Sequence, residues 1–184
     1  MPGTIHVAAR FNGPPDSGNG GYAAGLIAGA IGTNVNVRLA RPVPMNRDLV
    51  ITPCAPDRWE VHAGSELIAT AAAHVVQADV PQPPSWVEAF GASQHFDGFR
   101  RHVYPTCFVC GPERPAGQGL RIFPGSVPGT PLLAAPWRPD VSLGDGSGNV
   151  RPEFIWAALD CPGYFASVGP RPGLLGEQIG RAHV

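Results

Sequence analysis

The chain has 184 residues, a formal net charge of −1, 43% hydrophobic residues and 15% charged residues, and its 24 glycines and 22 prolines make up a quarter of it. This length fits one ordinary domain or two small ones, and the hydrophobic fraction argues against disorder. All thirteen basic residues are arginines, and they are scattered singly apart from Arg100 and Arg101. Because a nucleic-acid surface needs a concentrated basic stripe, we expect small molecules or proteins as partners and no nucleic acid.

The N-terminal residues show no basic leader followed by an apolar run, and glycines interrupt the longest apolar stretch, 22–31. These features predict neither a signal peptide nor a membrane-spanning segment. Without a secretory signal, the four cysteines indicate a reducing environment and no disulfide framework. We therefore expect a cytoplasmic protein with no membrane partner.

The first part of the chain predicts a strand, a helix and a four-stranded antiparallel meander. Residues 4–11 alternate as a strand, and a glycine-rich loop leads into an apolar segment of helical length at 22–32. Four runs rich in β-branched residues follow, separated by turn signals, at 34–43, 47–54, 58–65 and 66–76. Because the helix has no polar face, we expect a curved sheet to wrap around it in an α+β fold.

The second part of the chain repeats the order of strand, loop and apolar helix. Residues 80–106 are expected to be a linker with one helical turn near 85–90. Strands are predicted at 119–127 and 130–137, a polar loop at 140–149, and a helix at 151–160 with Pro152 in its first turn. Because the order recurs after about 130 residues, we expect a duplicated unit. The predicted divisions are a first unit at 1–79, the linker, and an incomplete second unit at 107–178.

The last six residues, IGRAHV, match the translation of a common sequencing adapter up to the stop codon of that adapter. We therefore expect residues 179–184 to be a non-native tail. The natural chain is then expected to be cut near Glu177.

Two segments together resemble a known family. Asn19, Gly20 and Gly21 open the first predicted helix, and VRLARPVPMNRDLVI follows in the predicted meander. The segment CFVCGPERPAGQGLRIFPG resembles the C-x-x-C-G-x-x-N-x-x-G-L segment of phenylacetyl-CoA-thioesterase-like proteins. Over most of residues 4–176 the chain thus resembles the hotdog-fold acyl-CoA thioesterases. The resemblance implies a tandem double hotdog that hydrolyses an acyl-CoA or acyl-carrier thioester without a metal or redox cofactor.

In that family His-Gly-Gly begins the central helix, and an acid stands seven positions after the second glycine. The helix-start amides polarise the thioester carbonyl, and the acid activates water or attacks the carbonyl carbon. In this chain the first half keeps Asn-Gly-Gly but has Ala28 at the position of the acid, whereas the second half keeps the acid, Asp160, but has Pro152 at the position of the first glycine. The resemblance implies that Asn19, Gly20, Gly21 and Asp160 form one complete site. The mirror-image site would be inactive because proline has no amide hydrogen.

The residues of the expected site could also have purely structural roles. Asp160 could bond a backbone amide or an arginine in the core, or face solvent if Pro162 ends the helix. Gly20 and Gly21 could serve only a tight turn and close packing. Asn19 is a good helix N-cap whether or not a thioester binds.

Two further groups of residues are candidates for binding. Arg100, Arg101 and Arg114 could meet the phosphates of coenzyme A, although a solvated basic patch is an equal alternative. Cys107 and Cys110 have the spacing of half a zinc site, but no second pair follows. Because Cys54, Cys161 and His102 are scattered along the sequence, we expect buried thiols and no metal.

Two alternative functions accompany thioester hydrolysis. The split motif and the missing histidine suggest a non-catalytic acyl-CoA-binding or scaffold protein. Hydration of an enoyl thioester is the third option, and it ranks last because no histidine accompanies Asp160. The sequence leaves the oligomeric state open, and a homo-oligomer is compatible with it.

Overall fold

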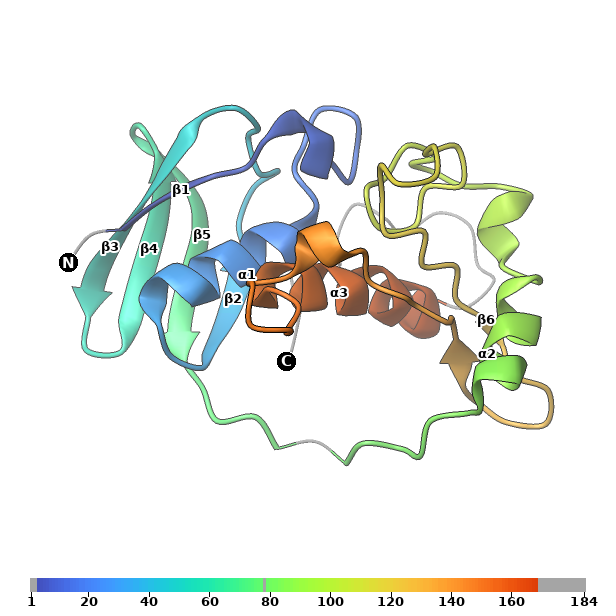
Figure 1. Cartoon of the computed structure of the whole chain (residues 1–184). Coiled ribbons are helices and arrows are strands. Elements are labelled where there is room, and N and C mark those ends of the chain that lie inside the picture. The colour runs from blue at the N-terminus through green and yellow to red at the C-terminus, as the bar shows by residue number, and fades with distance from the viewer. Residues whose placement is uncertain (1–2, 78, 169–184) are drawn as a thin grey trace.

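The structure is a computed structural model that describes residues 3–77 and 79–168, so the expected tail at 179–184 lies outside the described residues. Its described part contains one five-stranded antiparallel sheet, a small two-stranded sheet and three α-helices, in an α+β arrangement (Figure 1). The predicted α+β class is confirmed. In the part of the chain that the structure describes, no helix is long and apolar enough to cross a membrane.

The five-stranded sheet is built entirely from residues 3–73. Its elements are β1 (Gly3–His6), β2 (Val35–Leu39), β3 (Asp48–Ala55), β4 (Arg58–Ala63) and β5 (Glu66–Ala73). The strand order is β1-β3-β4-β5-β2, with every pair antiparallel. The predicted strands therefore exist, but the predicted four-stranded meander is wrong, because only β3, β4 and β5 follow one another as hairpins.

Strand β2 leaves the meander because its connection to β3 cannot be a tight hairpin. That connection, residues 40–47, contains Pro42 and Pro44, which lack the amide hydrogen that a ladder needs. β2 instead pairs with the alanine-rich β5 at the far edge of the sheet, where Val35 lies opposite Ala73 and Val37 opposite Ala71. The crossover places β1 and β2 at opposite edges of one sheet.

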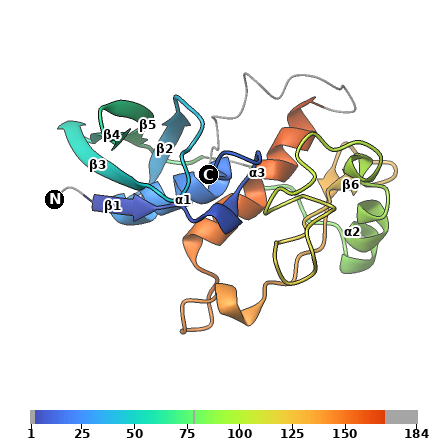
Figure 2. The same ribbon diagram turned by 90° about the horizontal axis from the view of Figure 1, so that it is seen from above.

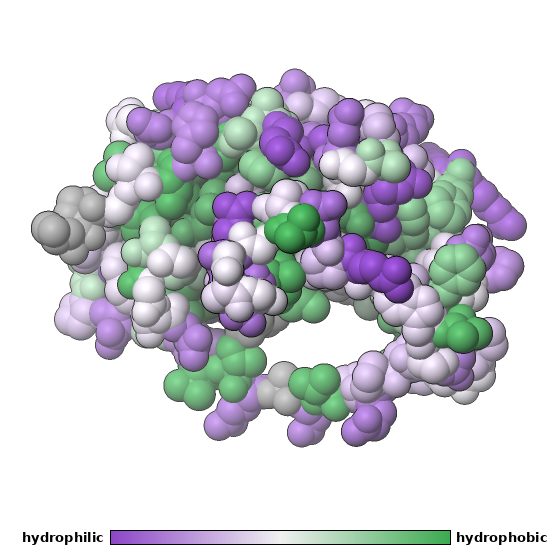
Figure 3. All heavy atoms as spheres, in the orientation of Figure 1, coloured by the Kyte–Doolittle hydropathy of each residue, from purple (hydrophilic) through white to green (hydrophobic). Residues whose placement is uncertain are grey.

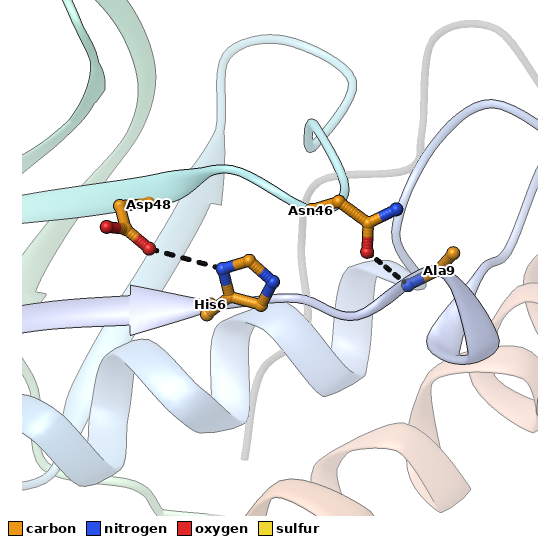
Figure 4. A network of polar contacts seen from close by, with 4 residues as sticks. All are labelled: His6, Ala9, Asn46 and Asp48. Carbon is orange, nitrogen blue, oxygen red and sulfur yellow. Dashed lines mark hydrogen bonds and ion pairs between the residues drawn. The ribbon is translucent and has the colours of Figure 1, made fainter.

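The first strand is shorter than the predicted 4–11 segment. The chain turns into a 3-10 helix at Ala9–Phe11, and two polar contacts tie β1 to the start of β3 and this turn to the loop before β3. The Nδ1 of His6 lies 3.2 Å from Oδ1 of Asp48, and the backbone N–H of Ala9 donates to Oδ1 of Asn46 at 3.0 Å (Figure 4). The break at residue 7 thereby turns the chain towards the loop that precedes the first helix.

Helix α1 (Gly20–Ile31) lies in the curve of this sheet, as the view from above shows (Figure 2). Most of its residues are buried, and Ile27 packs into a continuous core with Val37, Leu49 and Val61. The helix ends at Gly32, whose φ of 78° is left-handed and favours glycine. The expected apolar helix wrapped by a curved sheet is therefore present.

Between the sheet and the second half, the chain contains more helix than predicted. Residues 74–77 and 79–85 are extended and stand away from the body of the molecule (Figures 1 and 3). Helix α2 (Trp86–Ser93) then replaces the single turn expected near 85–90. A capping box fixes the start of this helix, because the Ser85 hydroxyl accepts from the Glu88 N–H and the Glu88 carboxylate accepts from the Ser85 N–H.

The predicted strands at 119–127 and 130–137 are wrong in extent. The described structure contains only β6 (Gly125–Ser126) and β7 (Leu133–Ala134), which pair with each other. Four prolines in this segment, at positions 124, 128, 131 and 136, remove the donors that longer ladders would require. Residues 79–168 therefore contain no sheet comparable to that of the first half.

The second apolar helix, α3 (Pro152–Val168), is longer than the predicted 151–160 segment. Pro162 lies inside it and does not end it, so the alternative in which the helix stops beside Asp160 is wrong. Proline inside a helix removes one hydrogen bond and strains the preceding turn. Pro162 therefore weakens the helix within one turn of Asp160.

Candidate functional site

Helices α1 and α3 pack closely against each other, and glycines on α1 make the approach possible. A Cβ at Gly21 would lie 2.5 Å from the carbonyl oxygen of Trp156 and 2.6 Å from the Cβ of Asp160. A Cβ at Gly25 would lie 2.6 Å from the Cα of Glu153. Because real Cβ atoms do not approach this closely, the packing requires glycine at both positions.

This packing brings Asp160 to the first turn of α1. Its Oδ2 accepts a hydrogen bond from the backbone N–H of Gly21 at 3.0 Å and another from Nδ2 of Asn19 at 3.3 Å. Asn19 and Gly21 come from the N-terminal half of the chain, and Asp160 comes from the C-terminal half. Three of the four residues predicted for the composite site are thus in direct contact.

Asn19 also fixes the start of α1. Its Oδ1 accepts from the backbone N–H of Tyr22 at 2.9 Å, and its backbone carbonyl accepts from Ala23 at 3.0 Å. The amide side chain therefore caps the helix with its oxygen and holds Asp160 with its nitrogen. The described residues offer no acceptor to the N–H of Gly20, the fourth predicted residue, so this first-turn donor remains available.

The surroundings of Asp160 disfavour its charged form. Burial between the helices raises the pKa of this carboxyl to about 6, and a negative charge on Cys107 adds to the rise. The hydrogen bonds from Gly21 and Asn19 favour the carboxylate and limit the shift. A carboxyl group with this pKa can accept and return a proton near neutral pH.

The mirror-image position lacks these features. The two helices run antiparallel, since Gly21 faces Asp160 whereas Gly25 faces Glu153, so Ala28 lies towards the Pro152 end of α3. Alanine supplies no carboxylate there, and proline supplies no amide hydrogen. The nearest acid on α3, Glu153, has its Oε1 at 3.6 Å from the Nε of Arg151.

The three arginines considered for phosphate binding differ in their surroundings. The guanidinium of Arg114 donates to the carbonyls of Thr106 at 3.0 Å and Gln118 at 3.3 Å, and also to the side chain of Asn12. It therefore holds two loops together. Arg100 and Arg101 are exposed, and the described part of the chain shows no partner for their side chains.

The structure also gathers three cysteines that the sequence leaves apart. Cys161 on α3 joins Cys107 and Cys110, and all three Sγ atoms lie within 4.8 Å of one another. Hydrogen bonds from the Cys110 and Cys161 thiols lower the pKa of Cys107 well below its usual value. The sequence spacing pairs Cys107 with Cys110, but only the packing of α3 brings Cys161 to them.

The chain matches no protein-family model, no curated protein and no solved structure. The resemblance to hotdog-fold thioesterases therefore depends on the residues quoted from the sequence.

Proposed function

We propose that this protein hydrolyses an acyl thioester with Asp160 and the first-turn amides of α1, in a hotdog-like double unit. One observation carries the proposal: the Gly21 N–H and the Asp160 Oδ2 are 3.0 Å apart, although 139 residues separate them in the chain. This contact joins the amide of one half to the acid of the other. It is the pairing that the split motif requires.

In the proposed reaction, the carbonyl oxygen of the thioester replaces Oδ2 as the acceptor of the Gly21 N–H. The positive end of the helix, with the Gly20 and Gly21 donors, then polarises the carbonyl. The displaced carboxylate takes a proton from a water molecule, whose oxygen attacks the carbonyl carbon. The carbon–sulfur bond breaks, and the thiolate leaves with the proton that Asp160 holds. The reaction consumes only water and the thioester.

Asn19 acts as a positioning residue in this proposal. It stands where the family has histidine, and its Nδ2 contact with Oδ2 keeps the carboxylate oriented when the Gly21 N–H donates to the substrate instead.

The exposed Arg100 and Arg101 are the arginines proposed to meet the phosphates of coenzyme A. Arg114 is the weaker candidate because carbonyl oxygens already occupy its guanidinium. We further propose that the protein is cytoplasmic, as its free thiols suggest.

The test is hydrolysis of a panel of acyl-CoA thioesters, followed by mass spectrometry of the released acids. Asp160→Asn is expected to lower kcat by about 10²–10⁴-fold, because the amide cannot accept the proton of water. Glu153→Gln is the matched control: it removes a carboxylate from the same helix, one that faces Arg151 and does not contact Gly21. This control should retain the activity of the natural sequence.

Other outcomes separate the alternatives. Unchanged turnover in Asp160→Asn would refute the role of this residue. Acyl-CoA binding without turnover in the natural sequence would favour the non-catalytic binding protein. Addition of water to an enoyl-CoA without release of coenzyme A would favour the hydratase.

A further inference from the structure

The cluster formed by Cys107, Cys110 and Cys161 is a separate feature of the molecule. Two of its members belong to the turn 107–110, and the third lies on α3. All three are buried free thiols, whereas the remaining cysteine, Cys54, is exposed on β3. Two distant segments of the chain thus bring three thiols together in the interior.

The spacing of the sulfur atoms matches that of thiolate ligands around one metal ion. The Sγ atoms of Cys107 and Cys161 are 3.9 Å apart. Two thiolates at 2.3 Å from a tetrahedral zinc ion lie about 3.8 Å from each other. A disulfide would bring two sulfur atoms to about 2.05 Å, far closer than this pair.

Backbone hydrogen bonds hold the turn that carries two of the thiols. Cys107 N–H donates to the Tyr104 carbonyl at 2.9 Å, and Gly111 N–H donates to the Cys107 carbonyl at 2.9 Å. Neighbouring residues anchor the turn to the rest of the fold, since Phe108 N–H donates to the Asn12 carbonyl at 2.8 Å. The ligand positions are therefore set by the fold before any ion binds, which lowers the cost of ordering them.

His102, in the preceding loop, is not a member of the cluster. Its ring packs against the rings of Phe96 and Phe165, with centroids 5.9 Å away in both cases. Its Nδ1 accepts from the backbone N–H of Tyr104 at 3.0 Å. Within residues 3–77 and 79–168 the cluster thus offers three ligands, and a tetrahedral ion would keep one position for a water molecule.

We propose that Cys107, Cys110 and Cys161 bind one zinc ion as thiolates, with water as the fourth ligand. Thiolates favour zinc over the harder divalent cations. The ion links the 107–110 turn to α3 next to Asp160. Its binding therefore stabilises the packing of this turn against α3. This proposal concerns metal binding alone and does not depend on thioester hydrolysis.

The experiment measures metal content in the full chain purified under reducing conditions. We expect about one zinc ion per chain by elemental analysis, and after exchange with Co²⁺ a thiolate-to-cobalt charge-transfer absorption in the near ultraviolet. Cys161→Ser should lose both signals. Cys54→Ser is the matched control and should keep both, because its thiol is exposed and outside the cluster.

A second measurement covers the case in which Cys161→Ser does not fold. In the natural sequence, zinc should slow the alkylation of Cys107, Cys110 and Cys161 relative to the same protein treated with a chelator, as followed by mass spectrometry. A folded protein that takes up neither zinc nor cobalt with its thiols reduced would overturn the proposal. So would a disulfide among the three cysteines in the purified protein under reducing conditions.

Discussion

The regions 3–77 and 79–168 both centre on an apolar helix, but only the first surrounds its helix with a sheet. Helix α1 lies between the five-stranded sheet on one side and α3 on the other. Helix α3 packs on α1 and on loops, and it leaves Ile155 and Leu159 exposed by 38% and 52%. Helix α1 is therefore the structural centre of the described chain, whereas α3 depends on α1 for most of its burial.

The largest expected effect on stability is a difference between α1 and α3. It is measured by truncating one large aliphatic side chain on each helix. Ile27 on α1 is 1% exposed, so Ile27→Ala should lower the free energy of unfolding by about 2–5 kcal/mol. Leu159→Ala on α3 should change it by no more than about 0.5 kcal/mol, because this side chain is already half in solvent. Chemical denaturation of both variants gives the comparison. Equal losses of unfolding free energy in the two variants would mean that the side chains of α3 are as deeply buried as those of α1.

A smaller effect tests the contact between the two regions. Gly25→Ala should destabilise the protein by about 1–3 kcal/mol, because the new methyl group would meet the backbone of Glu153. Gly29→Ala is the matched control on the same helix, where nothing lies within 4 Å of the added Cβ. It should raise stability by about 0.5–1 kcal/mol through helix propensity.

Thermal unfolding of the two glycine variants measures this difference. A stabilising effect of alanine at both positions would show that α1 and α3 do not approach as closely as described. A loss of stability in Gly25→Ala alone would establish the interface between α1 and α3 on which the candidate site depends.

Much of the first region follows from its sequence, because local signals agree with the fold there. Alternation and turn residues locate β3, β4 and β5, and Asn19 before an apolar run locates the start of α1. The place of β2 could not be predicted, because its partner β5 is not the next strand in the chain and local alternation does not specify such a distant partner.

The second region follows less well from its sequence, because prolines and long-range packing decide it. Hydrophobic runs at 119–137 suggest strands, but the prolines within them prevent extended pairing. The pairing of Asp160 with the Asn-Gly-Gly start of α1 could be inferred from the split motif. The meeting of Cys161 with Cys107 could not, because 54 positions separate them and only the rotation of α3 brings their thiols together.

The most direct test of the composite site is a nuclear magnetic resonance titration of protein labelled with ¹⁵N-glycine. The ligand is an acyl-CoA analogue in which a methylene group replaces the thioester sulfur and the carbonyl group remains. We expect the amide resonances of Gly20 and Gly21 to shift on binding, whereas that of Gly29, at the exposed end of α1, should not. Binding that leaves Gly20 and Gly21 unperturbed, or no binding at all, would contradict the assignment of the α1 amides and Asp160 as one thioester site.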